Sequence, residues 1–148
     1  MYADIDEFRS RLGQAIFNEI YEITDNSDEA ELSVVLSDLA SSAAEIDGAL
    51  AFRYKFPITG EKTLALLKDW NLTLAEERAY SRPAGGEFTE KLKLRTAQVR
   101  QYLEMIREDR FILPDAAEKS SSSSAGGGKI ALVQCDSPIF DRDKMEGF

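Results

Sequence analysis

The chain has 148 residues, of which 43% are apolar and 30% are charged, and it contains no histidine and one cysteine. This length predicts one domain of ordinary size, and a single cysteine excludes an internal disulfide. Without histidine, a Ser-His-Asp triad, a Cys-His pair and a histidine-containing zinc site are excluded. No apolar run approaches the ~20 residues needed to cross a bilayer, so we expect no membrane partner. The net charge of −9 argues against a protein built mainly to neutralise nucleic-acid phosphates.

The N-terminal region predicts a helix that opens at Asp4. Asp4 and Glu7 form a D-x-x-E pattern, in which the first side chain satisfies a free backbone N–H of the first helical turn. Gly13 predicts a kink or a break in this helix, because glycine is unfavourable in a helix interior. The polar stretch TDNSD at 24–28 predicts the turn to the next helix.

The second predicted helix has the clearest helical period. Its apolar residues recur at alternating steps of four and three, which places them on one stripe. Arg53 and Lys55 suit the C-terminal end of a helix, and Pro57 stops it. Gly48 costs roughly 1 kcal/mol relative to alanine in mid-helix, so it marks either the close approach of another helix or a bend. The stripe consists of Leu32, Leu36, Leu39, Ala43, Ile46 and Leu50.

Two further helices are predicted, at about 61–81 and 87–110, with a turn at 83–86 between them. The helix at 61–81 carries two apolar stripes, so we expect it to be covered on both sides, by the rest of the bundle or by a neighbouring chain. No convincing period-2 alternation precedes residue 129. The predicted fold class is therefore all-α, a bundle of about four helices, one of them broken. The two stripes are Leu67, Trp70 and Leu74, and Leu72, Ala75 and Ala79.

Composition changes sharply after Pro114, which predicts three parts: a helical bundle domain at 1–114, a flexible linker at 115–128 and a C-terminal docking segment at 129–148. The Ser/Gly-rich linker has nothing to bury and behaves as a tether. The segment beyond it begins KIALVQ, a run of high strand propensity that suits a sheet edge in another chain. The alternative is that the segment folds back onto its own bundle, but a tether gives reach and favours a partner.

Charge is divided unevenly along the chain. Residues 1–50 carry 12 acidic and 2 basic residues, a net of −10, whereas residues 51–114 carry 9 acidic and 12 basic residues, a net of +3. One interpretation is that two solvated faces simply differ in charge. The other is that unlike faces of neighbouring copies meet head to tail, a contact that closes into a ring when the rotation permits.

The remaining candidate residues give no catalytic site. Glu76 and Glu77 point about 100° apart on a helix and do not converge, so we interpret both as solvated surface. Gly126–Gly128 with Lys129 lacks the spacing of a phosphate loop, and Cys135 has no neighbouring base. We therefore expect no enzyme activity, no cofactor and no metal. A basic cluster interleaved with acidic residues predicts a mixed solvated face: Lys91, Lys93, Arg95, Arg100, Arg107 and Arg110.

Three stretches resemble a family of small structural proteins from Mu-like phages and prophages. They are the opening MYADIDEF, the stretch AEIDGALAFRYKFP at Ala44–Pro57 and the closing IFDRDKMEGF at Ile139–Phe148. A D-G-x-L-x-x-R-Y-x-x-P pattern is typical of this family, as is a C-terminal tail after a Gly/Ser-rich spacer. The family is also similar, more remotely, to the head–tail connectors (adaptors) of long-tailed phages. The residues that match the helix pattern are Asp47, Gly48, Arg53, Tyr54 and Pro57.

The resemblance implies a virion structural protein that is not an enzyme: a head–tail connector forming a ring beneath the portal. By analogy with the portal, the ring would be dodecameric. Its partners would be copies of itself, the portal protein and a neighbouring tail-side connector, with DNA passing through an acidic lumen without specific binding. It would be found in the virion, after assembly in the host bacterial cytoplasm. The alternative is a small helical protein-binding module or regulator that acts through its C-terminal peptide.

The resemblance also implies a role for the tail. C-terminal segments of such connectors commonly reach into the portal or an adjacent ring, often by adding a strand. The tail residues that match the family are therefore the predicted partner-binding residues: Ile130, Leu132, Ile139, Phe140, Arg142, Asp143, Met145 and Phe148.

Overall fold

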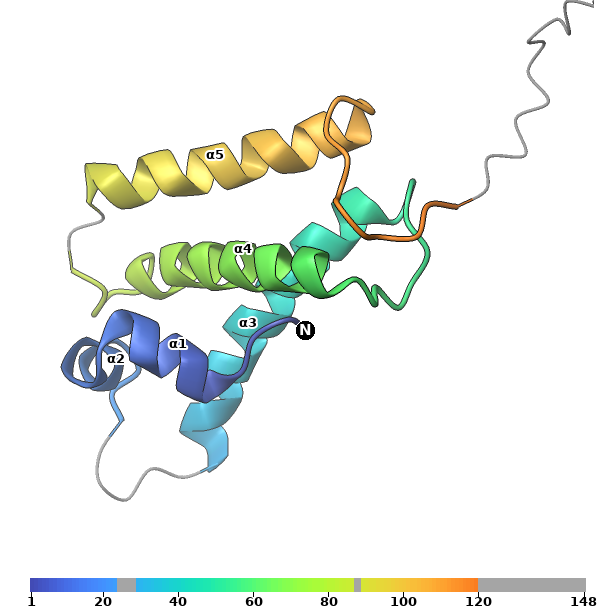
Figure 1. The fold of residues 1–148 in the computed structure, drawn as a ribbon. Coiled ribbons are helices and arrows are strands. Elements are labelled where there is room, and N and C mark those ends of the chain that lie inside the picture. Colours follow the sequence, from blue (N-terminus) through green and yellow to red (C-terminus); the bar gives the residue numbers. More distant parts are fainter. Residues whose placement is uncertain (24–28, 87–88, 120–148) are drawn as a thin grey trace, which may run out of the picture.

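The computed structural model is helical and describes residues 1–23, 29–86 and 89–119, without the side chains of 29–31 (Figure 1). Over these residues the chain forms no sheet, and only an isolated antiparallel bridge joins Tyr54 to Glu118. The predicted all-α bundle is confirmed. The helices of the described residues are α1 (Ile5–Leu12), α2 (Gln14–Ile20), α3 (Glu29–Leu50), α4 (Glu61–Tyr80) and α5 (Glu90–Arg107).

The first helix begins and ends where the sequence predicts. A carboxylate oxygen of Asp4 accepts from the backbone N of Glu7 at 2.8 Å, and the Glu7 side chain accepts from the backbone N of Asp4 at 3.3 Å. Gly13 then adopts a φ of +85°, a conformation that L side chains rarely adopt. The helix is broken there into α1 and α2, which confirms the predicted break.

Helices α3, α4 and α5 pack on one another, and α1 and α2 lie against α4 and the N-terminal half of α3 (Figure 1). In Figure 1, α5 runs alongside α4, while α3 crosses α4. Two buried clusters follow from this arrangement. One joins the C-terminal half of α3 to α4 and α5, and the other joins α1, α2 and the N-terminal half of α3 to α4.

Helix α4 contributes to both clusters and is the centre of the bundle. Its stripe with Leu67, Trp70 and Leu74 belongs to the first cluster, and its second stripe of Leu72, Ala75 and Ala79 belongs to the other. All six side chains are buried within one chain. The predicted coverage on both sides is therefore confirmed, and the helices of the same chain provide it.

The predicted stripe of α3 is wrong at Leu36. Leu39, Ala43, Ile46 and Leu50 are buried as predicted, but Leu36 is 41% exposed. Val35 is fully buried in its place, because α1 and α2 cover the side of the helix that carries it. The sequence period alone does not reveal where this second layer lies.

Two other details concern the predicted helices: one of the two alternatives for Gly48 is excluded, and α5 begins later than predicted. A Cβ at Gly48 would meet no heavy atom within 4 Å, so no described helix approaches closely there. Helix α5 begins at Glu90, three residues later than predicted, because Thr89 caps it: the Thr89 side chain accepts from the backbone N of Leu92 at 3.4 Å.

Candidate functional site

The segment that follows α3 holds the last described residues of the chain against the body. Residues 51–55 lie on one side of this contact, and residues 109–119 lie on the other. We call this contact the clasp. It contains Arg53 and Tyr54 of the family-like pattern, and residues 120–148 continue directly from it.

Backbone hydrogen bonds align the two sides of the clasp. The N–H of Lys55 donates to the carbonyl of Ala117 at 2.9 Å, and the N–H of Lys119 donates to the carbonyl of Arg53 at 2.7 Å. The ammonium group of Lys119 also donates to the carbonyl of Ala51. The chain therefore leaves the described body at a fixed point beside the C-terminal end of α3.

The Arg53 guanidinium joins both ends of the post-α5 segment. It donates to Asp109 at 2.8 Å and to Glu118 at 2.9 Å. Asp109 has a φ of +58°, which turns the chain directly after α5. One cation thus pairs with two carboxylates that precede and follow the returning segment.

Tyr54 and Asp47, two more residues of the family-like pattern, make internal hydrogen bonds near the clasp. The buried Tyr54 accepts from the backbone N of Leu113 at 2.9 Å. Asp47 accepts from the hydroxyl of Tyr2, and burial together with this hydrogen bond raises the pKa of Tyr2 above its usual range. These residues anchor the two ends of the described chain to the end of α3.

Asp115 closes the clasp onto the start of α4. Its carboxylate accepts from the backbone N–H groups of Lys62 and Thr63, each at 2.9 Å. These donors belong to the first turn of α4, whose N-cap, Gly60, offers no side chain. A Cβ at Gly60 would lie 2.3 Å from a carboxylate oxygen of Asp115, so only glycine permits this cap.

The eight predicted partner-binding residues all lie in 120–148, outside the described residues. The clasp shows where that segment begins, and the bundle that carries it is described. The structure neither brings these eight residues together nor separates them. They are Ile130, Leu132, Ile139, Phe140, Arg142, Asp143, Met145 and Phe148.

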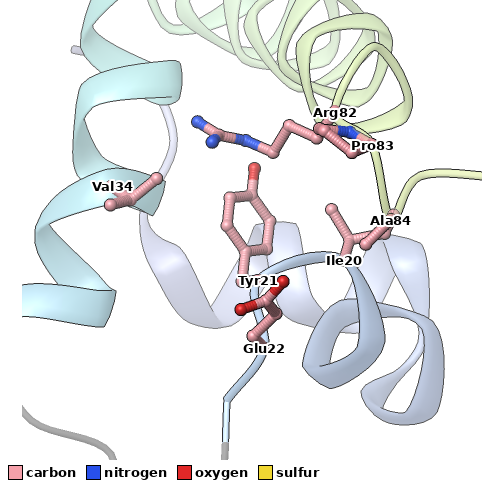
Figure 2. Close-up of a pocket in the computed structure, with 7 residues that line it drawn as sticks. All are labelled: Ile20, Tyr21, Glu22, Val34, Arg82, Pro83 and Ala84. Atoms are coloured by element: carbon pink, nitrogen blue, oxygen red, sulfur yellow. The ribbon is translucent and has the colours of Figure 1, made fainter.

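A second candidate is a cavity of about 380 Å³ at the other end of the bundle (Figure 2). Beside it, the Tyr21 hydroxyl donates to Asp38 at 2.9 Å, and Arg82 donates to the same carboxylate at 2.8 Å. Burial and the bond to Asp38 raise the pKa of Tyr21 above its usual range. These bonds link Tyr21, directly after α2, to Asp38 of α3 and to Arg82, which follows α4. The lining residues are Ile20, Tyr21, Glu22, Val34, Arg82, Pro83 and Ala84.

The prediction that Glu76 lies on the solvated surface is wrong. Its residue is only 8% exposed, and its carboxylate lies 3.3 Å from Arg11 and 3.7 Å from Arg95. Burial raises the pKa of Glu76, and the two arginines oppose this shift. Glu76 and Glu77 do not converge: Glu77 pairs with Arg100 instead, at 2.5 Å.

The basic cluster on α5 is a mixed face, as predicted. Within the described chain, Arg95 and Arg100 pair with carboxylates of α4, while Lys93 pairs with Glu90 at 2.6 Å. In the described ranges, no three cysteine, aspartate or glutamate side chains are placed so that they could hold a metal ion together. No helix among them has both the length and the apolar character needed to cross a bilayer.

The comparison with protein families covers two of the stretches that carry the resemblance, the N-terminal one and Ala44–Pro57. Residues 2–132 match the family model described as Bacteriophage Mu, Gp36. The chain belongs to this family. The match to the Mu Gp36 family includes every described helix and both sides of the clasp, and it confirms the predicted resemblance to proteins of Mu-like phages. No curated protein and no solved structure matches the chain.

Proposed function

We propose that this member of the Mu Gp36 family is a virion structural protein that joins the phage head to the tail. The observation that carries the proposal is the clasp. It fixes the exit of the chain on a folded helical body, and 29 further residues follow Lys119. A folded body with a long, partly apolar extension provides two parts that a connector needs, one for each neighbour.

In this proposal the body assembles as a ring beneath the portal, dodecameric by analogy with the portal. Adjacent copies meet head to tail, a contact that closes into a ring when the rotation permits. An acidic lumen lets DNA pass without binding, because it repels the phosphates. The protein is then a component of the virion, assembled in the bacterial cytoplasm.

The C-terminal segment is the part that binds the portal or a tail-side connector. Its apolar residues are separated by charges, so a few anchors bind while the polar residues remain hydrated. Phe140 is the aromatic anchor of the family-like IFDRD stretch. No catalytic role is assigned. Arginines pair with the carboxylates at the cavity and in the clasp: Arg82 with Asp38, and Arg53 with Asp109 and Glu118.

The test is a complementation assay with a phage that lacks the protein. Deleting 129–148 or replacing Phe140→Asp should leave the bundle folded but yield filled heads without tails. Ser122→Asp in the tether is the matched control, because it adds the same charge outside the anchors, and it should support normal particles. Undiminished infectious titre from the deletion would refute the joining role.

The mass of the purified protein tests the ring against the alternative of a helical binding module that acts through its C-terminal peptide. A ring predicts a large closed oligomer, either alone or after addition of portal. A stable monomer that does not respond to portal would favour the binding module.

A further inference from the structure

Between residues 33 and 52, the outward side of α3 and of the two residues that follow it carries no charge, although 30% of the chain is charged. Every exposed residue from 33 to 52 is serine, alanine, glycine, valine, leucine or phenylalanine. Leu36 is 41% exposed and Phe52 is 82% exposed. We call this surface the α3 outer face, and it consists of Leu36, Ser37, Ala40, Ser41, Ala44, Gly48, Ala51 and Phe52.

The charged side chains of the same stretch of α3 are engaged away from this face. Each is only partly exposed and is bonded to another element of the body. An apolar, uncharged strip of this kind favours an apolar occupant, since removing its surface from water stabilises the contact. The bonded pairs are Asp38 with Arg82, Glu45 with Arg78 and Arg100, and Asp47 with Tyr2.

The clasp delivers the chain to one end of the α3 outer face. Lys119 bonds to the carbonyls of Ala51 and Arg53, and Ala51 is the last alanine of that face. From Leu36 to Ala51 a helix spans about 22 Å. The nine residues at 120–128 can cover at most about 30 Å. The next segment of the same chain therefore reaches any point along the face.

The segment after the tether has the matching chemistry. Ile130–Cys135 is an uncharged run, IALVQC, bounded by Lys129 and Asp136. Six extended residues span about 20 Å, close to the length of the face. We propose that residues 130–135 pack on the α3 outer face of their own chain. A short tether makes this contact intramolecular, at an effective concentration in the range of ~1 mM, which favours the same chain over a second copy.

This inference deepens the proposed function and rests on it only in taking 129–148 as the docking segment. Before assembly, the apolar start of that segment is covered by α3. The portal or the tail-side connector then competes with α3 for it. The isolated chain thereby avoids exposing an uncharged helix face and an apolar segment at the same time.

A nitroxide on Cys135, the single cysteine, tests the contact in the full chain by its broadening of amide NMR signals. The amides of Ala40, Ala44 and Gly48 should lose intensity, and those at 94–98 in α5 should keep it. Ala44→Glu should restore the α3 signals, because it places a charge in the face. Ala97→Glu is the matched control, an exposed helical alanine on α5, and it should leave the broadening unchanged.

A mixed sample separates the same chain from a second copy. Isotope-labelled chains without nitroxide are mixed with unlabelled chains that carry it, and the proposal predicts no broadening in the labelled chains. Broadening of α3 in this sample would overturn the proposal in favour of exchange between copies. Weak, even broadening over the whole body of the spin-labelled chain would overturn it in favour of an undocked segment. Neither result changes the outcome of the head–tail joining assay, which tests the proposed function separately.

Discussion

Arg53 and Tyr54 of the family-like pattern bind the residues from which the C-terminal segment continues. Arg53 pairs with Asp109 and Glu118, and Tyr54 accepts from the backbone of Leu113. These partners lie 56 to 65 positions further along the chain. Sequence reasoning found the pattern only by resemblance, because nothing local to Arg53 indicates which distant carboxylates it meets.

Glu76 gives a prediction at the residue scale. Because burial raises its pKa despite Arg11 and Arg95, the folded state binds the Glu76 proton more tightly than the unfolded chain. Wild-type stability should therefore increase relative to Glu76→Gln as the pH falls from 7, and the gain is complete below the unfolded pKa of about 4.3. Urea denaturation of both proteins at several pH values measures the difference in unfolding free energy. If that difference instead increased with rising pH, the two arginines would outweigh burial.

At the scale of elements, the local signals were sufficient for most of the helices. The Asp4–Glu7 capping box, the break at Gly13 and the two stripes of α4 each depend on residues a few positions apart. What the sequence did not reveal depends on tertiary neighbours. Val35 is buried instead of Leu36 because α1 and α2 pack on that side of α3. Glu76 is buried because it lies between α1 and α5.

Two leucines of α3, Leu39 and Leu36, test which side of this helix faces the core. Leu39→Asp places a charge with no partner at a fully buried position. The cost is several kcal/mol, compared with a free energy of unfolding of roughly 5–15 kcal/mol for a domain of this size. In a chain ending at Lys119, which lacks the segment proposed to cover the α3 outer face, Leu36→Asp should change stability by only about 0.5 kcal/mol. Thermal unfolding followed by circular dichroism distinguishes the two. Equal melting temperatures would show that the side of α3 facing the core is assigned incorrectly.

At the scale of the whole molecule, the all-α bundle was predictable from the sequence, but the clasp was not. The predicted bundle domain ends at Pro114, where the helical period stops. In the structure, contacts with the body continue through Asp115, Glu118 and Lys119. The cap that Asp115 provides for α4 has no signal in the sequence around Gly60, because its two halves meet only after folding.

Two truncated chains measure the contribution of these last residues. A chain ending at Pro114 lacks the α4 cap, which alone contributes about 1 kcal/mol, and it lacks the Arg53–Glu118 pair. Its free energy of unfolding should therefore be about 1–2 kcal/mol lower than that of a chain ending at Lys119. Urea denaturation of the two gives the difference directly. Equal unfolding free energies would mean that the bonds of 115–119 add nothing to the body.

The clasp also determines how the molecule responds to mechanical tension on its extension. A pull applied beyond Lys119 first loads the bonds to Ala51 and Arg53, and then the Asp115 contacts at the first turn of α4. The force passes in this way into the C-terminal end of α3 and the first turn of α4. In the proposed connector, tension on the C-terminal segment would therefore be carried by the end of α3 and the start of α4 of each copy.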